Sequence, residues 1–196
     1  MSVLNVIPII ATNPSTVFNV NYLLVGGGGA GGAGNNSPSP NYSGGPGGGG
    51  GGVVESSFTI TKGATYTVAV GKGGNGRVAI NLAGYSGGNT TLSNTSLGIN
   101  FIAYGGGGGG LTSTQETKSI GSQGGKYRIS SGPSPTQGSL GGTCVQASGG
   151  GGGGGYSFAG TTPGTRGDGG NGYSSSISGT STFYGGGGGA GGWGST

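Results

Sequence analysis

Five uninterrupted glycine runs constrain this chain more than any other feature of its sequence. They span residues 26–29, 47–52, 105–110, 149–155 and 185–189, and glycine fills 59 of the 196 positions. Fixing the backbone of one residue costs about 1–2 kcal/mol, and glycine loses the most freedom on folding. Ordering the glycines therefore costs on the order of 60–120 kcal/mol, with no side chains to bury in return. A folded state must offset this cost through the backbone itself.

Two features distinguish the chain from a disordered, low-complexity segment. Its glycines and 8 prolines make up about a third of the residues, a share that usually indicates disorder. Disordered chains, however, tend to carry many charges and few aromatic residues, whereas only 5% of these residues are charged and 8% are aromatic. The apolar residues also cluster, as in VFNVNYLLV (17–25), VVESSFTI (53–60) and INFIAY (99–104). The pattern favours an ordered chain that is held in an assembly.

Packed polyproline II helices offer the glycine runs a folded state. Such a helix has three residues per turn and no internal hydrogen bonds, so its backbone groups need partners on neighbouring chains. A helix with neighbours on all sides has no room for a Cβ atom, whereas the collagen triple helix needs glycine only at every third position. The runs have no G-X-Y period. We therefore predict a bundle of polyglycine II helices, with a core that includes Gly27, Gly49, Gly107, Gly108, Gly152 and Gly187.

Alternating polar and apolar residues predict strands between the glycine runs. The clearest pattern predicts a β-hairpin that joins 57–60 to 65–70 through the turn 61–64. Further strands are expected at 20–25, 77–82, 89–92 and 99–104. No window has helical spacing free of glycine and proline. The expected fold class is all-β or irregular: a small antiparallel β-sheet base with a bundle of packed polyglycine II helices and no α-helix.

The order of these elements predicts one glycine-rich domain, residues 21–196, preceded by an N-terminal docking arm, residues 1–20. Three segments rich in Ser, Thr, Asn and Pro are expected to be loops: 35–46, 111–137 and 156–165. If each strand continues straight into its glycine run, all three loops lie at the end of the bundle opposite the sheet. The chain would return toward the base through residues 138–142.

Few residues in this sequence suit catalysis or metal binding. There is no histidine, Cys144 is the single cysteine, and the acids Glu55, Glu116 and Asp168 are far apart in sequence. Metal sites and histidine- or cysteine-based catalytic groups are therefore missing or unsupported. We expect no enzymatic activity, no metal and no cofactor. Nucleic-acid binding is not expected because the basic residues form no dense patch, and membrane insertion is not expected because no segment approaches about 20 apolar residues.

The order of motifs resembles the glycine-rich domain of bacteriophage tail-fibre and tail-tip proteins. It comprises NYLLVGGGGAGG, then GGGGGGVVESSFTITKGATYTVAVGKGGNG, INFIAYGGGGGG and a closing YGGGGGAGGWG, over about residues 21–194. The chain also resembles, more loosely, the receptor-recognising adhesins of T-even-type phage long tail fibres. In those adhesins, packed polyglycine II helices present variable loops that choose the bacterial receptor. The resemblance implies that the loops of this chain choose a bacterial receptor. Lys118, Lys126, Tyr127 and Arg128 in loop 111–137 suit an acidic target such as lipopolysaccharide or an outer-membrane protein loop.

Two functions follow as expectations. The first is a phage or virion tail adhesin, whose β base docks on a fibre or virion protein while its loops bind the bacterial surface. The alternative is a structural subunit of a self-assembling extracellular fibre or virion shell, in which the N-terminal arm adds a strand to another copy. The expected location is the virion, at the tail fibre or tip, or alternatively an extracellular fibre. The candidate receptor-binding residues are Asn35, Asn36, Asn41, Tyr42, Lys118, Lys126, Tyr127, Arg128, Tyr156, Phe158 and Arg166.

Overall fold

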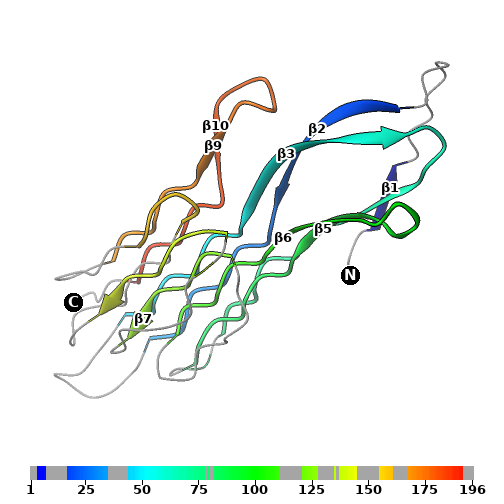
Figure 1. Cartoon of the computed structure of the whole chain (residues 1–196). Coiled ribbons are helices and arrows are strands. Elements are labelled where there is room, and N and C mark those ends of the chain that lie inside the picture. The colour runs from blue at the N-terminus through cyan, green and yellow to red at the C-terminus, as the bar shows by residue number, and fades with distance from the viewer. Residues whose placement is uncertain are drawn as a thin grey trace, which may run out of the picture.

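A computed structural model describes residues 4–7, 17–34, 44–77, 79, 82–110, 121–127, 135, 137–144, 155–160 and 167–191. Figure 1 shows the longer strands at one end of these residues and extended glycine segments leading away from them. The elements are β1 Leu4–Ile7, β2 Val17–Val25, β3 Val53–Thr61, β4 Tyr66–Ala69, β5 Thr90–Asn94, the 3-10 turn η1 Thr95–Leu97, β6 Ile99–Ala103, β7 Lys126–Tyr127, β8 Thr143–Cys144, β9 Tyr173–Ser175 and β10 Thr182–Tyr184. The described part of the chain has no α-helix, and the predicted all-β class is confirmed.

The β base consists of two antiparallel sheets that pack against each other. One is the ribbon β2–β3, and the other has the strand order β1-β4-β5-β6. Their shared core contains six buried side chains: Tyr22, Leu24, Ile60, Tyr66, Leu92 and Ala103. Aromatic rings connect the sheets, because Phe101 stacks on Tyr22 at 4.9 Å and meets Phe58 edge-on at 5.3 Å between ring centroids. Side-chain burial therefore stabilises the base.

The predicted hairpin between residues 57–60 and 65–70 is wrong in its pairing. A turn does join the two strands at Lys62–Gly63, with a φ of 76° at Gly63. However, β3 pairs with β2 over nine residues, while β4 pairs with β1 and β5 in the other sheet. The inward side chains of β3 face β4 across the core, where the rings of Phe58 and Tyr66 lie 5.5 Å apart. Alternation shows which face of a strand is apolar, but it does not select the neighbouring strand.

The other strand predictions have mixed outcomes. Strands at 20–25, 89–92 and 99–104 are confirmed by β2, β5 and β6. The remaining expected strand, 77–82, is described only at residues 77, 79 and 82, and these residues lie outside any strand. The predicted arm, residues 1–20, includes β1 and the first part of β2, and β1 pairs with β4 of the same chain. Docking of this arm on another protein stays a prediction.

Five glycine-rich segments continue the strands of the base. Segment 26–34 follows β2, 44–52 leads into β3, 71–77 follows β4, 82–89 leads into β5 and 104–110 follows β6. Figure 1 shows these segments passing alongside one another beyond the sheets. All described residues of 47–52 and 105–110 are buried. Each strand therefore passes into a glycine segment that other chain segments surround.

Backbone hydrogen bonds join these segments with a period of three residues. Gly26, Gly29 and Gly32 donate N–H bonds of 2.8–2.9 Å to carbonyl groups of Gly52, Gly49 and Pro46. The residues that follow each of them, Gly27, Ala30 and Ala33, donate instead to Gly88, Tyr85 and Leu82 at 2.9 Å. A three-residue period is that of the polyproline II helix. Successive backbone groups consequently bond to different neighbours.

Three polar side chains bond to the backbone where the strands meet the glycine segments. The Thr90 hydroxyl accepts from the Gly71 N–H at 2.9 Å and donates to the Val25 carbonyl at 2.6 Å. The Asn89 carboxamide oxygen accepts from the N–H of Gly105 at 2.9 Å. The carboxamide of Gln137 accepts from the Tyr104 N–H at 2.9 Å and donates to the Ile102 carbonyl at 2.8 Å. These side chains bond to backbone groups at the junctions where the two-residue period of the strands gives way to the three-residue period of the glycine segments.

The predicted path of the chain through residues 111–142 is wrong. Gly107 and Gly110 donate to Ser122 and Gly125, so segment 121–125 runs parallel to 104–110. The Gln123 N–H then donates to the Ser139 carbonyl, and β7 pairs with β8 in parallel. Residues 137–144 therefore run away from the base instead of returning to it. The backbone bonding of GSQGG, residues 121–125, places a bundle segment inside the predicted loop.

The described part of the predicted loop 156–165 also lies elsewhere than expected. Its Tyr156 N–H donates to the Gly185 carbonyl at 3.0 Å, and Gly185 is adjacent to Gly51 and Val53 at the base. The chain turns here because Gly155 N–H donates to the carbonyl of Phe158 at 2.9 Å. This turn is consequently near the sheets and not at the far end of the bundle.

Candidate functional site

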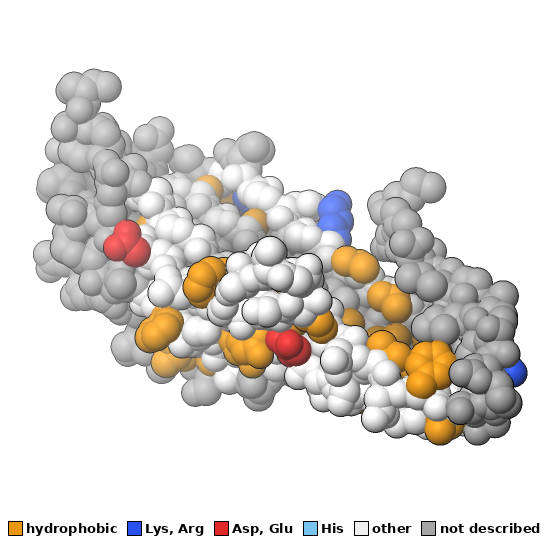
Figure 2. Space-filling model, turned by 90° about the horizontal axis from the view of Figure 1, so that it is seen from above, with side chains coloured by type: hydrophobic (Ala, Val, Ile, Leu, Met, Phe, Trp, Pro, Cys, Tyr) orange, Lys and Arg blue, Asp and Glu red, His pale blue; other side chains and the backbone are white. Residues whose placement is uncertain are grey.

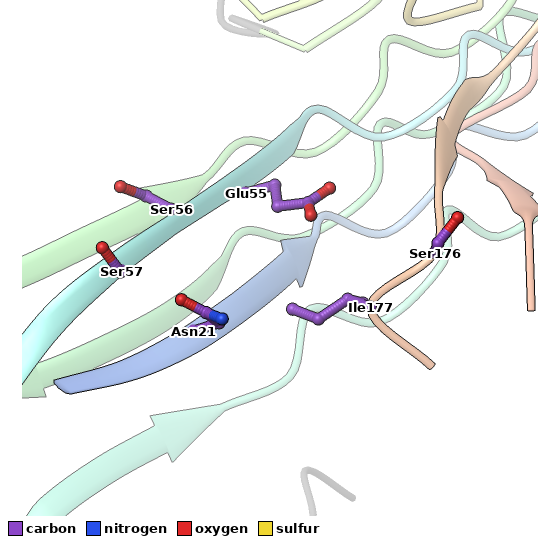
Figure 3. A pocket seen from close by; sticks show the side chains of 6 residues that line it. All are labelled: Asn21, Glu55, Ser56, Ser57, Ser176 and Ile177. Atoms are coloured by element: carbon purple, nitrogen blue, oxygen red, sulfur yellow. The ribbon is translucent and has the colours of Figure 1, made fainter. Parts of the chain in front are cut away.

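A groove of about 510 Å³ lies between the β2–β3 ribbon and the segment that follows β9. Its lining residues are Asn21, Glu55, Ser56, Ser57, Ser176 and Ile177. Figure 3 shows the Glu55 side chain extending from β3 toward the β9 segment and the Ile177 side chain extending from that segment toward the ribbon. Five of the six lining residues are polar, and all six are solvent-exposed. The groove is therefore accessible to a polar ligand.

The strand register positions the residues of the first wall. Asn21 is opposite Ser57, and Leu23 is opposite Glu55. Because side chains alternate along a strand, Asn21, Ser57 and Glu55 share one face of the ribbon. The other face carries Tyr22 and Leu24 into the core. Burial of the apolar face thus directs this polar set toward solvent.

The second wall belongs to the β9–β10 hairpin. Thr182 pairs with Ser175, and Tyr184 pairs with Tyr173. The turn is stabilised by the Ile177 N–H, which donates to the Ser175 hydroxyl at 3.1 Å. The hydroxyl groups of Ser174 and Ser181 are hydrogen-bonded at 2.9 Å. These contacts hold the turn that carries Ser176 and Ile177.

Glu55 and Tyr173 connect the two walls. A hydrogen bond to the Glu55 carboxylate raises the pKa of Tyr173 above its ordinary value of 10.0, because the bond stabilises the neutral phenol. The Tyr173 ring also contacts Tyr156 edge-on, with 5.1 Å between ring centroids. Charge is otherwise sparse, and Figure 2 shows a face on which uncharged side chains and backbone predominate. Glu55 is thus the one charged group among the lining residues of the groove.

Replacing Glu55 by glutamine is expected to lower the pKa of Tyr173 toward 10.0, because the phenol loses its charged acceptor. In the wild type, the raised pKa contributes stability below pH 10.0, and this contribution is lost as the pH rises through the folded-state value. The Glu55→Gln variant should therefore show a weaker loss of stability above that pH. The measurement is an NMR titration of the Tyr173 ring carbon Cζ. Asp168→Asn serves as the control, and an unchanged Tyr173 titration in Glu55→Gln would contradict the prediction.

The structure separates the predicted receptor-binding residues. Lys126 and Tyr127 form β7, beyond segment 121–125, whereas Tyr156 and Phe158 lie near the base. Phe158 is 62% exposed. The remaining candidates lie outside the described residues: Asn35, Asn36, Asn41, Tyr42, Lys118, Arg128 and Arg166. The described candidates therefore do not form one surface.

The predicted glycine core is placed more uniformly. Gly27, Gly49, Gly107 and Gly187 donate backbone N–H bonds to neighbouring segments. A Cβ atom on Gly108 would lie less than 3.0 Å from the backbone of Gly84. Gly152 lies outside the described residues. The described members of this set thus lie in close contact with other glycine segments.

Sequence reasoning missed the groove. Asn21, Ser57 and Glu55 have the pattern of an ordinary solvated strand face, and the stretch YSSSISGTSTFY, residues 173–184, was not predicted to form strands. The available signal was the short aromatic pair Phe183-Tyr184 after a turn at Gly179, where φ is 95°. The two walls are more than a hundred residues apart in sequence, so their contact depends on the tertiary structure.

Among the residues that the structure describes, no three His, Cys, Asp or Glu side chains are grouped so as to hold a metal ion. No helix in the described ranges is long and apolar enough to cross a membrane.

Small antiparallel sheets joined to buried, backbone-bonded glycine segments define a glycine-rich β protein. The chain belongs to the glycine-rich domain family, whose profile matches residues 7–196. No curated protein and no solved structure matches the chain. The predicted resemblance is thus confirmed for the glycine-rich domain, and the connection with phage tail proteins stays a prediction.

Proposed function

We propose that this protein is a non-enzymatic adhesin of a phage tail fibre or tail tip. In this role the glycine bundle is a stiff support, and the polar connections that start at its far end bind a bacterial surface receptor. The receptor is an outer-membrane protein or lipopolysaccharide. The base docks on a fibre or virion protein, or on other copies of the chain.

Segment 104–110 is hydrogen-bonded through its backbone to four other segments, and this observation favours a stiff bundle. Gly106 donates to Gly27, Gly107 donates to Ser122 and accepts from Gly49, and Gly109 accepts from Gly84. The lengths of these bonds are 2.8–2.9 Å. Bending one segment would break bonds to several others at once. A support of this kind positions a binding surface with little loss of conformational entropy on binding.

The far ends of the segments are the points from which the polar connections start. Gly34, Gly110 and Tyr127 are the last described residues before 35–43, 111–120 and 128–134. These connections are rich in Ser and Thr, and residues 35–43 also contain Asn35, Asn36, Asn41 and Tyr42. Such residues combine contact area with adaptable hydrogen bonding, as in antibody loops. Their composition suits recognition of a polar bacterial surface.

Exchanging one of these connections for that of another family member is expected to change which bacteria the protein binds. The exchange should include only 35–43, 111–120 or 128–134, because 121–127 belongs to the bundle and to β7. Adsorption of the purified chain to a panel of Gram-negative strains measures the effect. We expect a different set of bound strains with an unchanged midpoint of urea unfolding.

The matched control exchanges the turn at Lys62–Gly63, which connects two strands of the base. This exchange should leave the set of bound strains as it was. Identical strain binding after all three exchanges of the polar connections would overturn the proposed function.

A further inference from the structure

We propose that the groove between the β2–β3 ribbon and the β9–β10 hairpin binds a neutral saccharide. The groove is formed by the base and the hairpin, not by the connections at the far end of the bundle. The inference therefore does not depend on the receptor-binding role proposed for those connections. It adds a second recognition site with a defined ligand chemistry.

The groups that line the groove match the hydroxyl groups of a sugar. The Glu55 carboxylate has two oxygens that accept hydrogen bonds, and acceptance from two adjacent hydroxyl groups is charge-assisted. The carboxamide of Asn21 and the serine hydroxyls both donate and accept. Sugar hydroxyls also both donate and accept, so they satisfy this mixed set. Ile177 offers an apolar surface for the C–H groups of the ring.

Other ligand classes match the groove less well. A divalent cation needs several oxygen ligands of high charge, whereas Glu55 is the one carboxylate in the lining. An apolar ligand would leave five polar lining residues without water. A strongly cationic peptide would meet a single carboxylate that already accepts from Tyr173. A neutral, hydroxyl-rich ligand avoids all three conflicts.

The walls of the groove are held in place before a ligand binds. The ring of Tyr156 packs edge-on against Tyr173 at the start of β9, with 5.1 Å between ring centroids. The first wall is carried by the paired strands β2 and β3, and the turn that carries the second wall is held by the paired strands β9 and β10. The volume of about 510 Å³ also falls in the range of small-molecule sites.

The polar face of the ribbon continues beyond the groove. Beyond Asn21 and Ser57, the next residues on this face are Asn19 and Thr59, which are opposite each other. Their side chains are hydrogen-bonded to each other at 2.7 Å and solvent-exposed. This arrangement provides further polar groups for a second sugar unit. The structure thus suits an oligosaccharide better than a single ring.

Saturation-transfer difference NMR on the full chain tests the proposal. The probes are D-glucose, D-galactose, D-mannose, L-rhamnose and N-acetyl-D-glucosamine, each with its methyl β-glycoside. At least one probe should receive saturation from the protein. For that probe, Glu55→Gln and Asn21→Ala should each weaken binding, with Glu55→Gln losing roughly tenfold or more because the charge-assisted bonds are lost. Asp168→Asn, the matched removal of an exposed acid away from the groove, should bind as the wild type does.

Three outcomes would overturn the proposal. These are no saturation transfer to any probe, equal binding by Glu55→Gln, Asn21→Ala and the wild type, and loss of binding on exchange of 35–43, 111–120 or 128–134. Unchanged amide spectra outside the groove confirm that the variants are folded. The exchange variants also distinguish this proposal from the proposed function. If they still bind the sugar but adsorb to the same bacterial strains as the wild type, the result supports sugar binding in the groove. It then counts only against receptor binding by the connections.

Discussion

Replacing Gly108 by alanine is expected to destabilise the protein by about 3 kcal/mol or more, although the substitution adds one methyl group. A Cβ atom at this position would lie less than 3.0 Å from the carbonyl oxygen and carbon of Gly84. Segments 82–89 and 104–110 cannot move apart freely, because the Gly84 N–H donates to the Gly109 carbonyl at 2.9 Å. The clash must therefore disrupt hydrogen bonds between buried segments. Urea unfolding followed by circular dichroism measures the loss.

Gly28→Ala is the matched control for this substitution. Gly28 is exposed, and the nearest heavy atom to its added Cβ would be the Gly49 carbonyl oxygen at 3.8 Å. The methyl group fits there and restricts the unfolded chain, so we expect unchanged stability or a gain of about 0.4–1 kcal/mol. A flexible glycine linker would tolerate both substitutions equally. Equal unfolding midpoints for Gly108→Ala and Gly28→Ala would therefore contradict the packed arrangement.

Replacing Thr90 by valine is expected to cost about 2–4 kcal/mol, with almost no change in side-chain volume. The Thr90 side chain is buried, with 4% of its surface exposed, and it bonds both the Gly71 N–H and the Val25 carbonyl. Valine leaves these two backbone groups without their partner at the start of the glycine segments. An unsatisfied buried group costs about 1–3 kcal/mol.

The neighbouring substitution Thr91→Val controls for the residue type. Thr91 points to the opposite, less buried side of β5. Its replacement is expected to change the free energy of unfolding by less than about 0.5 kcal/mol. Hydrogen exchange gives a local measurement, because the Gly71 amide should exchange faster in Thr90→Val and not in Thr91→Val. The same exchange rate in both variants would show that Thr90 does not stabilise this junction.

The predictions that succeeded from sequence depend on local patterns of residues. The runs 47–52 and 105–110 predicted segments without room for any side chain, and every one of their residues is buried. The apolar clusters VNYLLV and INFIAY beside glycine runs predicted β2 and β6. A continuous glycine run leaves no side chain in any direction, and a short apolar segment suits a half-buried strand. Such patterns can be recognised without knowledge of the neighbouring chains.

The predictions that failed concern neighbours. Segment 121–125 has the sequence GSQGG, and its Ser122 and Gln123 are buried at 0% and 2% exposure. Its polar residues made it resemble a loop. The groove was missed for a similar reason, because Asn21 and Glu55 line a groove only when the β9–β10 hairpin packs beside the ribbon.

By itself, the sequence determined that the chain forms strands at one end and tightly packed glycine segments at the other. Only the tertiary structure decided which segment lies beside which and in what direction. The physical reason is that glycine backbone groups are chemically identical, so any run can bond to any other run. The choice of neighbours depends instead on the strand register of the base and on the few side chains, Asn89, Thr90 and Gln137, that bond at the junctions. The same register places Asn21, Glu55 and Ser57 on one face of the ribbon, where they form a wall of the candidate site.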